Sequence, residues 1–147
     1  NGNPDVFKFP HTSMPGLHFS FSGIKTAFLY FLRDQTKKDP DFVKNNLNDI
    51  CASMQRHLVK MLLDKLVKAS EITGINRIAI AGGVSANTDL REQLKEVAVK
   101  KGWEIFIPDF QYCTDNAAMI AIAGYYKYQA GQFANQDVEP LPRMKFE

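Results

Sequence analysis

The fold is decided by one stretch of the chain, RIAIAGGVSANTDLREQLKEVAVKKGWEIFIP at residues 77–108. It begins with a short apolar run that ends in paired glycines, which predicts a strand followed by a tight turn. A helical pattern covers Thr88–Lys101, Gly102 stands where a left-handed helix end is expected, and the run Trp103–Pro108 predicts a second strand. Strand, helix and strand at this spacing predict a parallel pair joined by a right-handed crossover.

Two further strands are predicted upstream of this unit. They are the short runs Val6–Phe9 and Leu17–Ser22, and apolar and polar residues alternate along the second. The sequence therefore predicts an α/β domain with helices on the faces of a mixed sheet. With 147 residues, the chain is long enough for one such domain.

Apolar periodicity predicts three more helices, at Lys25–Lys38, Asp41–Ser70 and Asn116–Gln129. The middle one is long, so a break is predicted near Asn45–Asn48, and its apolar stripe, which includes Cys51 and Met54, is predicted to lie in the core. The last helix is rich in Ala and is expected to pack closely against another element. The tail from Gly131 is predicted to be irregular.

Composition and charge exclude several classes of protein. No apolar run approaches the roughly 20 residues that span a bilayer, and two cysteines favour a reducing, cytoplasmic compartment over a disulfide framework. The net charge of +2 does not by itself indicate a nucleic-acid binder. Between Lys25 and Ser70, however, nine basic and five acidic residues form either a polyanion-binding face or an ordinary solvated helix surface. The chain opens with Asn1 rather than Met, which predicts a piece of a longer protein.

The first motif that could carry chemistry is AGGVSAN at Ala81–Asn87, between the carboxyl end of a strand and the start of a helix. Ligands bind at that end of the strands in open α/β sheets. Gly82 and Gly83 lack Cβ atoms, so a flat ring or a sugar can lie on the backbone, and the helix N-terminus favours an anion. Asn87 is placed to cap the helix, to bind a ligand, or to do both.

The second motif is CTDNAA at Cys113–Ala118, at the next junction between strand and helix. Parallel strands would bring it to the same sheet edge as the paired glycines. Asp115 is then either a carboxylate that could hold a metal or, like Thr114, merely a helix cap. No second cysteine or histidine stands at ligand spacing nearby, so Cys113 is predicted to be a small apolar residue.

The third motif, FSFSGIKTA, places a strand-to-helix turn at Ser22-Gly23. Ser22 and Thr26 could contact a phosphate there, and Lys25 comes close to the turn. Alternatively, Gly23 is a packing residue and Lys25 a surface residue.

Taken together, FSFSGIKTA, IAGGVSANTDLREQL and CTDNAAMIAIAGY closely resemble, in order and spacing, the C-terminal part of the bacterial tRNA threonylcarbamoyladenosine transferases. That family was once called O-sialoglycoprotein endopeptidase, and the resemblance runs from about Phe7 to Gly131. It implies the actin-like, Hsp70-like ATPase fold (ribonuclease H-like), in which two similar α/β lobes flank a crevice. Residues 1–147 would form the C-terminal lobe, with the N-terminal lobe absent from this chain.

Residue by residue, the resemblance implies that Asp115 is a ligand of the family's single metal, iron or zinc. It also implies that Asn87, Gly82 and Gly83 hold the adenosine moiety of the substrate. The other metal ligands of the family are two histidines of an HxxxH motif in the first lobe, and this sequence has no such motif. We therefore expect the isolated chain to be folded but inactive, to retain no metal, to bind adenine nucleotide weakly, and to cover its exposed face by self-association.

The resemblance implies that the complete enzyme moves a threonylcarbamoyl group from threonylcarbamoyl-AMP to the amino nitrogen of the adenosine beside the tRNA anticodon. Its expected partners are tRNA, a paralogous subunit and an ATPase of the same pathway. Two alternatives are a carbamoyltransferase of hydrogenase maturation and a non-catalytic interaction lobe; SANTDLRE and CTDNAAMIA fit the tRNA enzyme better. The basic residues expected to meet tRNA phosphates are Lys37, Lys38, Lys44, Arg56, Lys60, Lys65 and Lys68.

Overall fold

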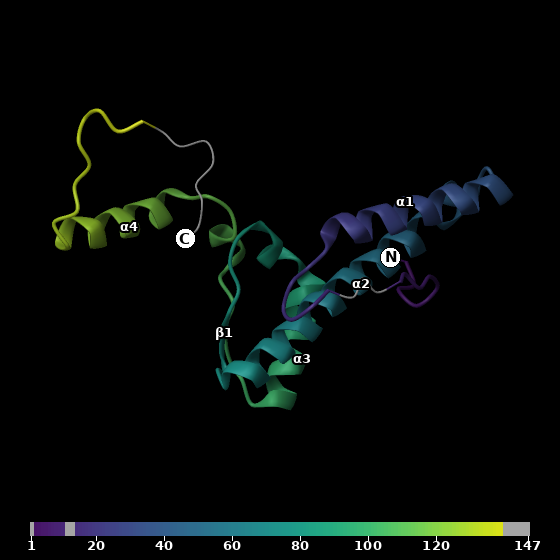
Figure 1. Ribbon diagram of the computed structural model, residues 1–147, viewed down its shortest axis with the longest axis horizontal. Helices are drawn as coiled ribbons and strands as arrows, with labels where there is room; N and C mark the ends of the chain where they lie inside the picture. Colours follow the sequence, from purple (N-terminus) through teal and green to yellow (C-terminus); the bar gives the residue numbers. More distant parts are fainter. Residues whose placement is uncertain (1, 11–13, 140–147) are drawn as a thin grey trace.

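A computed structural model describes residues 2–10 and 14–139 of the chain (Figure 1). Its elements, in chain order, are the helix α1 (Phe21–Lys38), the helix α2 (Phe42–Thr73), the strand β1 (Arg77–Ala79), the 3₁₀ turn η1 (Gly83–Ala86), the helix α3 (Thr88–Lys101), the strand β2 (Glu104–Phe106), the 3₁₀ turn η2 (Phe110–Tyr112) and the helix α4 (Ala117–Gln129). No helix among the described residues is long and apolar enough to cross a membrane.

The predicted parallel pair is confirmed. β1 and β2 lie side by side in parallel, with Ile78 opposite Ile105, and α3 connects them. The core lies between this pair, α3 and α2, where Leu94 is fully buried. Among the described residues, helices cover one face of the pair, and Phe106 on the other face remains 45% exposed. The fold is therefore α/β with a small parallel sheet, and the prediction of a mixed sheet is wrong for the described residues.

The strand predicted at Val6–Phe9 is not a strand, because side chains hold this segment instead of a β-ladder. Phe9 is buried, and its ring packs edge-on against Phe28 and Phe31 of α1, with centroids 5.5 and 5.2 Å apart. The Phe7 amide donates to the Ser53 hydroxyl of α2 at 3.2 Å, which satisfies a donor that a strand partner would otherwise accept.

The strand predicted at Leu17–Ser22 is also wrong, because α1 begins within it at Phe21. The Ser20 hydroxyl oxygen accepts a hydrogen bond from the Gly23 amide at 3.3 Å and so caps the helix. The apolar and polar alternation that suggested a strand therefore ends in a helix cap.

The long helix α2 has no break at Asn45–Asn48. Its apolar stripe follows the predicted spacing, but only part of the stripe is covered. Ile50 and Met61 are buried, Met54 is half-buried, and Cys51 is exposed, so the prediction of a core position for Cys51 is wrong. Among the described residues, no side chain covers Cys51, which instead lines an open apolar groove.

The small-residue helix α4 extends away from α1, α2 and α3 (Figure 1). No residue of α4 is buried, although Ile120 and Ile122 are large apolar side chains with 67% and 51% exposure. Its expected packing partner is therefore not among the described residues. The chain after Gly131 is irregular as far as it is described, as predicted.

Candidate functional site

The turn after β1 has the open backbone that the paired glycines predict. Gly82 has a φ of 79°, a conformation that L side chains rarely adopt, and the turn η1 begins at Gly83. A Cβ atom placed on Gly83 would meet no heavy atom within 4 Å, so the space above this backbone is free. Buried Ser85 closes the turn, because its hydroxyl donates to the Gly82 carbonyl at 2.7 Å.

Asn87 caps α3. Its side-chain oxygen accepts a hydrogen bond from the Leu90 amide at 2.9 Å, which satisfies one of the free donors at the start of the helix. The sequence left a capping role and a ligand role open, and the first of these is present. Asn87 also lines the apolar groove, so a ligand role for its amide group stays a prediction.

The turn that carries Asp115 comprises residues 108–116, which follow β2 and include η2. Asn116, not Thr114 or Asp115, caps α4: its side-chain oxygen accepts from the Met119 amide at 2.9 Å. The side chains of Thr114, Asp115 and Asn116 can all cap a helix. Because α4 begins at Ala117, Asn116 occupies the cap position. Cys113 is 1% exposed, which agrees with its prediction as a small apolar residue.

Asp115 is exposed, and within the described part of the chain its carboxylate has no hydrogen bond or ion pair. Such a carboxylate is free to bind a cation. No three His, Cys, Asp or Glu side chains among the described residues gather as a metal site, however, and a metal of the zinc type needs three or four protein ligands. Asp115 therefore fits the role of one metal ligand among several, and not that of a complete metal site.

The two turns lie at one edge of the sheet. Because β1 and β2 run parallel, both chains leave the pair at their carboxyl ends, so the glycine turn and the turn before α4 start from the same edge. A direct contact joins them: the Arg91 guanidinium donates to the Ser85 carbonyl on one side and to the Pro108 carbonyl on the other, each at 2.6 Å. Whether Asn87 and Asp115 face one crevice stays a prediction.

The third motif lies in the first two turns of α1. Ser22, Lys25 and Thr26 are exposed, and the Thr26 hydroxyl donates to the Ser22 carbonyl at 3.0 Å, as is common within helices. The structure thus places Ser22 and Lys25 on a helix surface and not in a strand-to-helix turn.

An apolar groove of about 650 Å³ connects this helix with the glycine turn, and sequence reasoning missed it. Phe21 and Phe28 of α1 line the groove, and so do Val84 of the glycine turn and Asn87. The sequence signal for this groove is the apolar stripe of α2, whose spacing by itself predicts buried core. The remaining lining residues come from α2 and α3 and are Cys51, Met54, Gln55, Leu58, Val59, Leu62 and Leu90.

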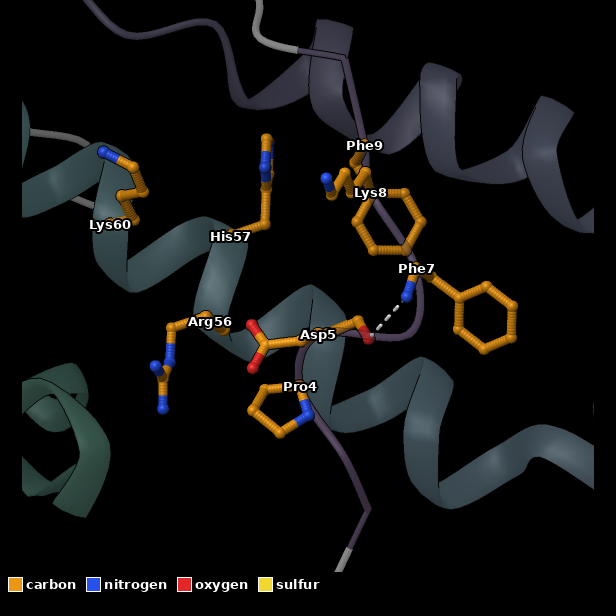
Figure 2. Close-up of a pocket in the computed structure, with 9 residues that line it drawn as sticks. Pro4, Asp5, Phe7, Lys8, Phe9, Arg56, His57 and Lys60 are labelled. Carbon is orange, nitrogen blue, oxygen red and sulfur yellow. Dashed lines mark hydrogen bonds between the residues drawn. The ribbon is translucent and has the colours of Figure 1, made fainter.

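Two of the predicted basic residues, Arg56 and Lys60, line a second pocket of about 320 Å³ between the N-terminal segment and α2 (Figure 2). Lys8, Arg56, His57 and Lys60 line it together with Asp5. Both helical cations have carboxylate partners: Lys60 lies 2.8 Å from Asp64, and Arg56 lies 3.7 Å from an oxygen of Asp89. The Lys60–Asp64 pair is exposed and the Asp89 side chain of the other pair is half-buried, and both pairs reduce the local positive charge.

The other predicted cations fall into two groups. Lys37 and Lys38 end α1, and Lys44 follows on the first turns of α2, so three exposed cations gather where these helices meet. Lys65, in contrast, is already occupied, because its ammonium donates to the Met14 and Gly16 carbonyls at 3.1 and 2.8 Å. Lys68 is exposed.

The fold and site define an α/β protein with an open glycine turn and a free carboxylate at one edge of a parallel pair. A sequence profile of the family described as tRNA N6-adenosine threonylcarbamoyltransferase matches residues 1–122. Curated proteins of that name from Cytophaga hutchinsonii and Christiangramia forsetii are each 55% identical to the chain, and one from Porphyromonas gingivalis is 50% identical. The three alignments cover 98%, 99% and 97% of this chain, but 42%, 43% and 42% of the relatives.

The chain therefore belongs to the tRNA N6-adenosine threonylcarbamoyltransferase family. It spans less than half the length of the curated relatives that it matches.

Proposed function

We propose that this chain is the C-terminal lobe of an actin-like, two-lobed enzyme that transfers a threonylcarbamoyl group from threonylcarbamoyl-AMP to the amino nitrogen of the adenosine beside the tRNA anticodon. The parallel register of β1 and β2 carries the structural part of this proposal. It makes the glycine turn, an open backbone suited to an adenylate, and the turn with an uncommitted carboxylate suited to a cation leave the sheet at the same edge. The family membership supports the reaction itself.

In this proposal, the glycine turn and Asn87 hold the adenosine moiety. A flat base or a ribose can approach the backbone at Gly82 and Gly83, because no side chain occupies the space above it. The Asn87 oxygen is engaged as the cap of α3, but its NH₂ group remains available as a donor toward a ligand.

Asp115 would be one ligand of a single iron or zinc ion, and the remaining ligands would come from the part of the longer relatives that this chain does not include. When bound, such an ion supplies Lewis-acid polarisation of a carbonyl or phosphate oxygen. The residues of this chain would orient the substrate. Asp115 would hold the ion from one side, and the glycine turn would hold the adenylate beside the ion.

The exposed cations where α1 and α2 meet, together with Lys8, Arg56, Lys60 and Lys68, are proposed to contact tRNA phosphates. Each phosphate contact adds a salt-dependent term to affinity without reading sequence, so the modest net charge does not oppose the role. Lys65 is the weakest candidate of the predicted set, because it is held by backbone carbonyls.

We propose that the uncovered apolar surfaces contact other protein surfaces. The face of α4 and the groove beside Asn87 would be covered by the rest of the longer protein, or by a second copy when this chain is alone. A paralogous subunit and an ATPase of the same pathway are the further partners that the resemblance implies. Size determination of the chain alone and in mixtures with those proteins tests each contact.

The decisive experiment compares two carboxylates of the same turn in the full-length protein. Asp115→Asn removes a charged metal ligand and should lower kcat/KM for threonylcarbamoyl transfer by more than about 100-fold, the upper range for losses outside the ligand shell. Asp109→Asn is the matched control, since Asp109 is exposed and its only hydrogen bonds within the described residues use the backbone carbonyl. Mass analysis of tRNA nucleosides and metal analysis provide the readouts. Equal activity of the two variants, with unchanged metal content, contradicts the metal role.

A further inference from the structure

Arg91 connects the two turns of the candidate site through more bonds than any other side chain there. It lies on the first turn of α3, half-buried, and its side chain reaches back toward the helix start. Its Nε donates to the Ser85 carbonyl at 2.6 Å. Its Nη2 donates to the Pro108 carbonyl at 2.6 Å and to the Cys113 sulfur at 3.1 Å. The guanidinium carbon Cζ lies over the Phe110 ring, 4.0 Å from its centroid.

Each of the two turns has internal hydrogen bonds of its own, in addition to those that Arg91 makes. In the glycine turn, the Ser85 hydroxyl and amide both bind the Gly82 carbonyl, at 2.7 and 2.9 Å. In the second turn, the Cys113 thiol donates to the Asp109 carbonyl at 3.5 Å. Ser85 and Cys113 are each 1% exposed, so the ends that Arg91 holds are themselves fixed in the interior. Among the described residues, no other side-chain hydrogen bond joins these turns.

The contacts require a guanidinium group. Its planar fork can donate in two directions while one face lies on an aromatic ring, and it stays charged at every physiological pH. A lysine ammonium is a single point at the end of a flexible chain, so it cannot serve the Ser85 and Pro108 carbonyls with separate nitrogens and cover Phe110 as well.

We infer that Arg91 is a positioning residue that fixes the glycine turn relative to the turn that carries Asp115. Cys113 lies two residues before Asp115, and Ser85 lies two residues before Asn87, so the clamp acts close to both proposed ligand contacts. For the enzyme this inference rests on the proposed function: Arg91 sets the position of the adenylate relative to the metal ligand without touching either.

Amide hydrogen exchange tests the clamp in the full-length protein, independently of the reaction. In Arg91→Lys, amides of both turns should exchange about tenfold faster, as expected for the loss of one charge-assisted hydrogen bond. Amides of α3 near Leu94 should keep their rates. Faster exchange in only one turn, or in neither, overturns the inference. The reporter amides are those with internal hydrogen bonds in the turns: Ser85, Asn87, Tyr112 and Cys113.

The matched control is Arg77→Lys. Arg77 also places its guanidinium over an aromatic ring, 5.5 Å from the Phe106 centroid, and donates to Glu104 at 2.8 Å, but it contacts neither turn. Its variant should leave all four reporter amides unchanged, and faster exchange there would overturn the assignment to Arg91. If Arg91→Lys does not fold, Phe110→Leu provides the test, because it removes the stacked ring at a side chain that is 60% exposed. It should loosen the same two turns to a smaller degree.

Kinetics separate this inference from the proposed function. If the protein transfers threonylcarbamoyl groups, Arg91→Lys should lower kcat about 100-fold, the scale of an ångström-sized misplacement, with KM for tRNA unchanged. A raised KM for tRNA with normal kcat overturns the positioning role. If the wild-type protein shows no transfer, the proposed function fails, while the exchange result still decides whether Arg91 clamps the turns.

Discussion

Asn87→Ala is expected to lower the free energy of unfolding by about 1 kcal/mol, because it removes the hydrogen bond that closes the start of α3. The lost bond is the 2.9 Å contact from the Leu90 amide, and Leu90 belongs to the same core cluster as the fully buried Leu94. In a chain of this size, that loss corresponds to a fall in Tm of about 2–4 °C. Urea unfolding can be followed by the fluorescence of Trp103, the single tryptophan, which packs against this core.

Two variants distinguish the cap from other roles of Asn87. Asn87→Asp keeps an acceptor oxygen and should unfold within about 0.5 kcal/mol of the wild type, while losing the amide donor that we propose for the ligand. Asn116→Ala removes a cap with the same 2.9 Å geometry from α4, which has no buried residue, and should leave the Trp103 transition unchanged. Equal destabilisation by the Ala and Asp variants at Asn87 would contradict the claim that the lost stability comes from the cap hydrogen bond.

Further predictions address the core, the glycine turn and the uncovered helix. Leu94→Ala should cost about 2–5 kcal/mol in urea unfolding, since this fully buried side chain leaves a cavity; a loss below 1 kcal/mol, measured the same way, contradicts its place in the core. Gly82→Ala should cost about 1–2 kcal/mol because of its φ of 79°, whereas Gly83→Ala should be neutral for stability and weaken nucleotide binding by the full-length protein. The chain alone should self-associate in analytical ultracentrifugation, and Ile120→Asn with Ile122→Asn should reduce this; a monomer at every concentration argues against a covered α4 face.

Local sequence signals predicted the parts of the fold whose cause is local. The apolar spacing of Thr88–Lys101 and the glycine after it determine a helix and its left-handed end, and Gly102 has a φ of 67°. A short crossover between two apolar runs leaves few topologies other than a parallel pair, and Ile78 opposite Ile105 is the result. The positions of the glycine turn and of Asp115 at the same sheet edge follow from that pair.

Both strand predictions in the first 22 residues are wrong, because a short apolar run or an alternation of apolar and polar residues shows only that one side of a segment is apolar. Phe7 and Phe9 satisfy the pattern of a strand, yet their rings pack between α1 and α2. A strand needs a partner for its backbone groups, and at Phe7 the hydroxyl of Ser53, 46 residues away, accepts the amide instead.

Sequence alone predicts the family, the helix that begins after Asn87 and the parallel pair, because each depends on the spacing and order of residue types along the chain. Only the tertiary structure decided that Cys51 faces an open groove and that Arg91 joins two turns. Pro108 and Cys113 lie 17 and 22 residues from Arg91, and no local pattern distinguishes an arginine that bridges such segments from one on the surface of a helix. Such contacts arise from packing between distant parts of the chain, where burial and hydrogen-bond geometry select the partners.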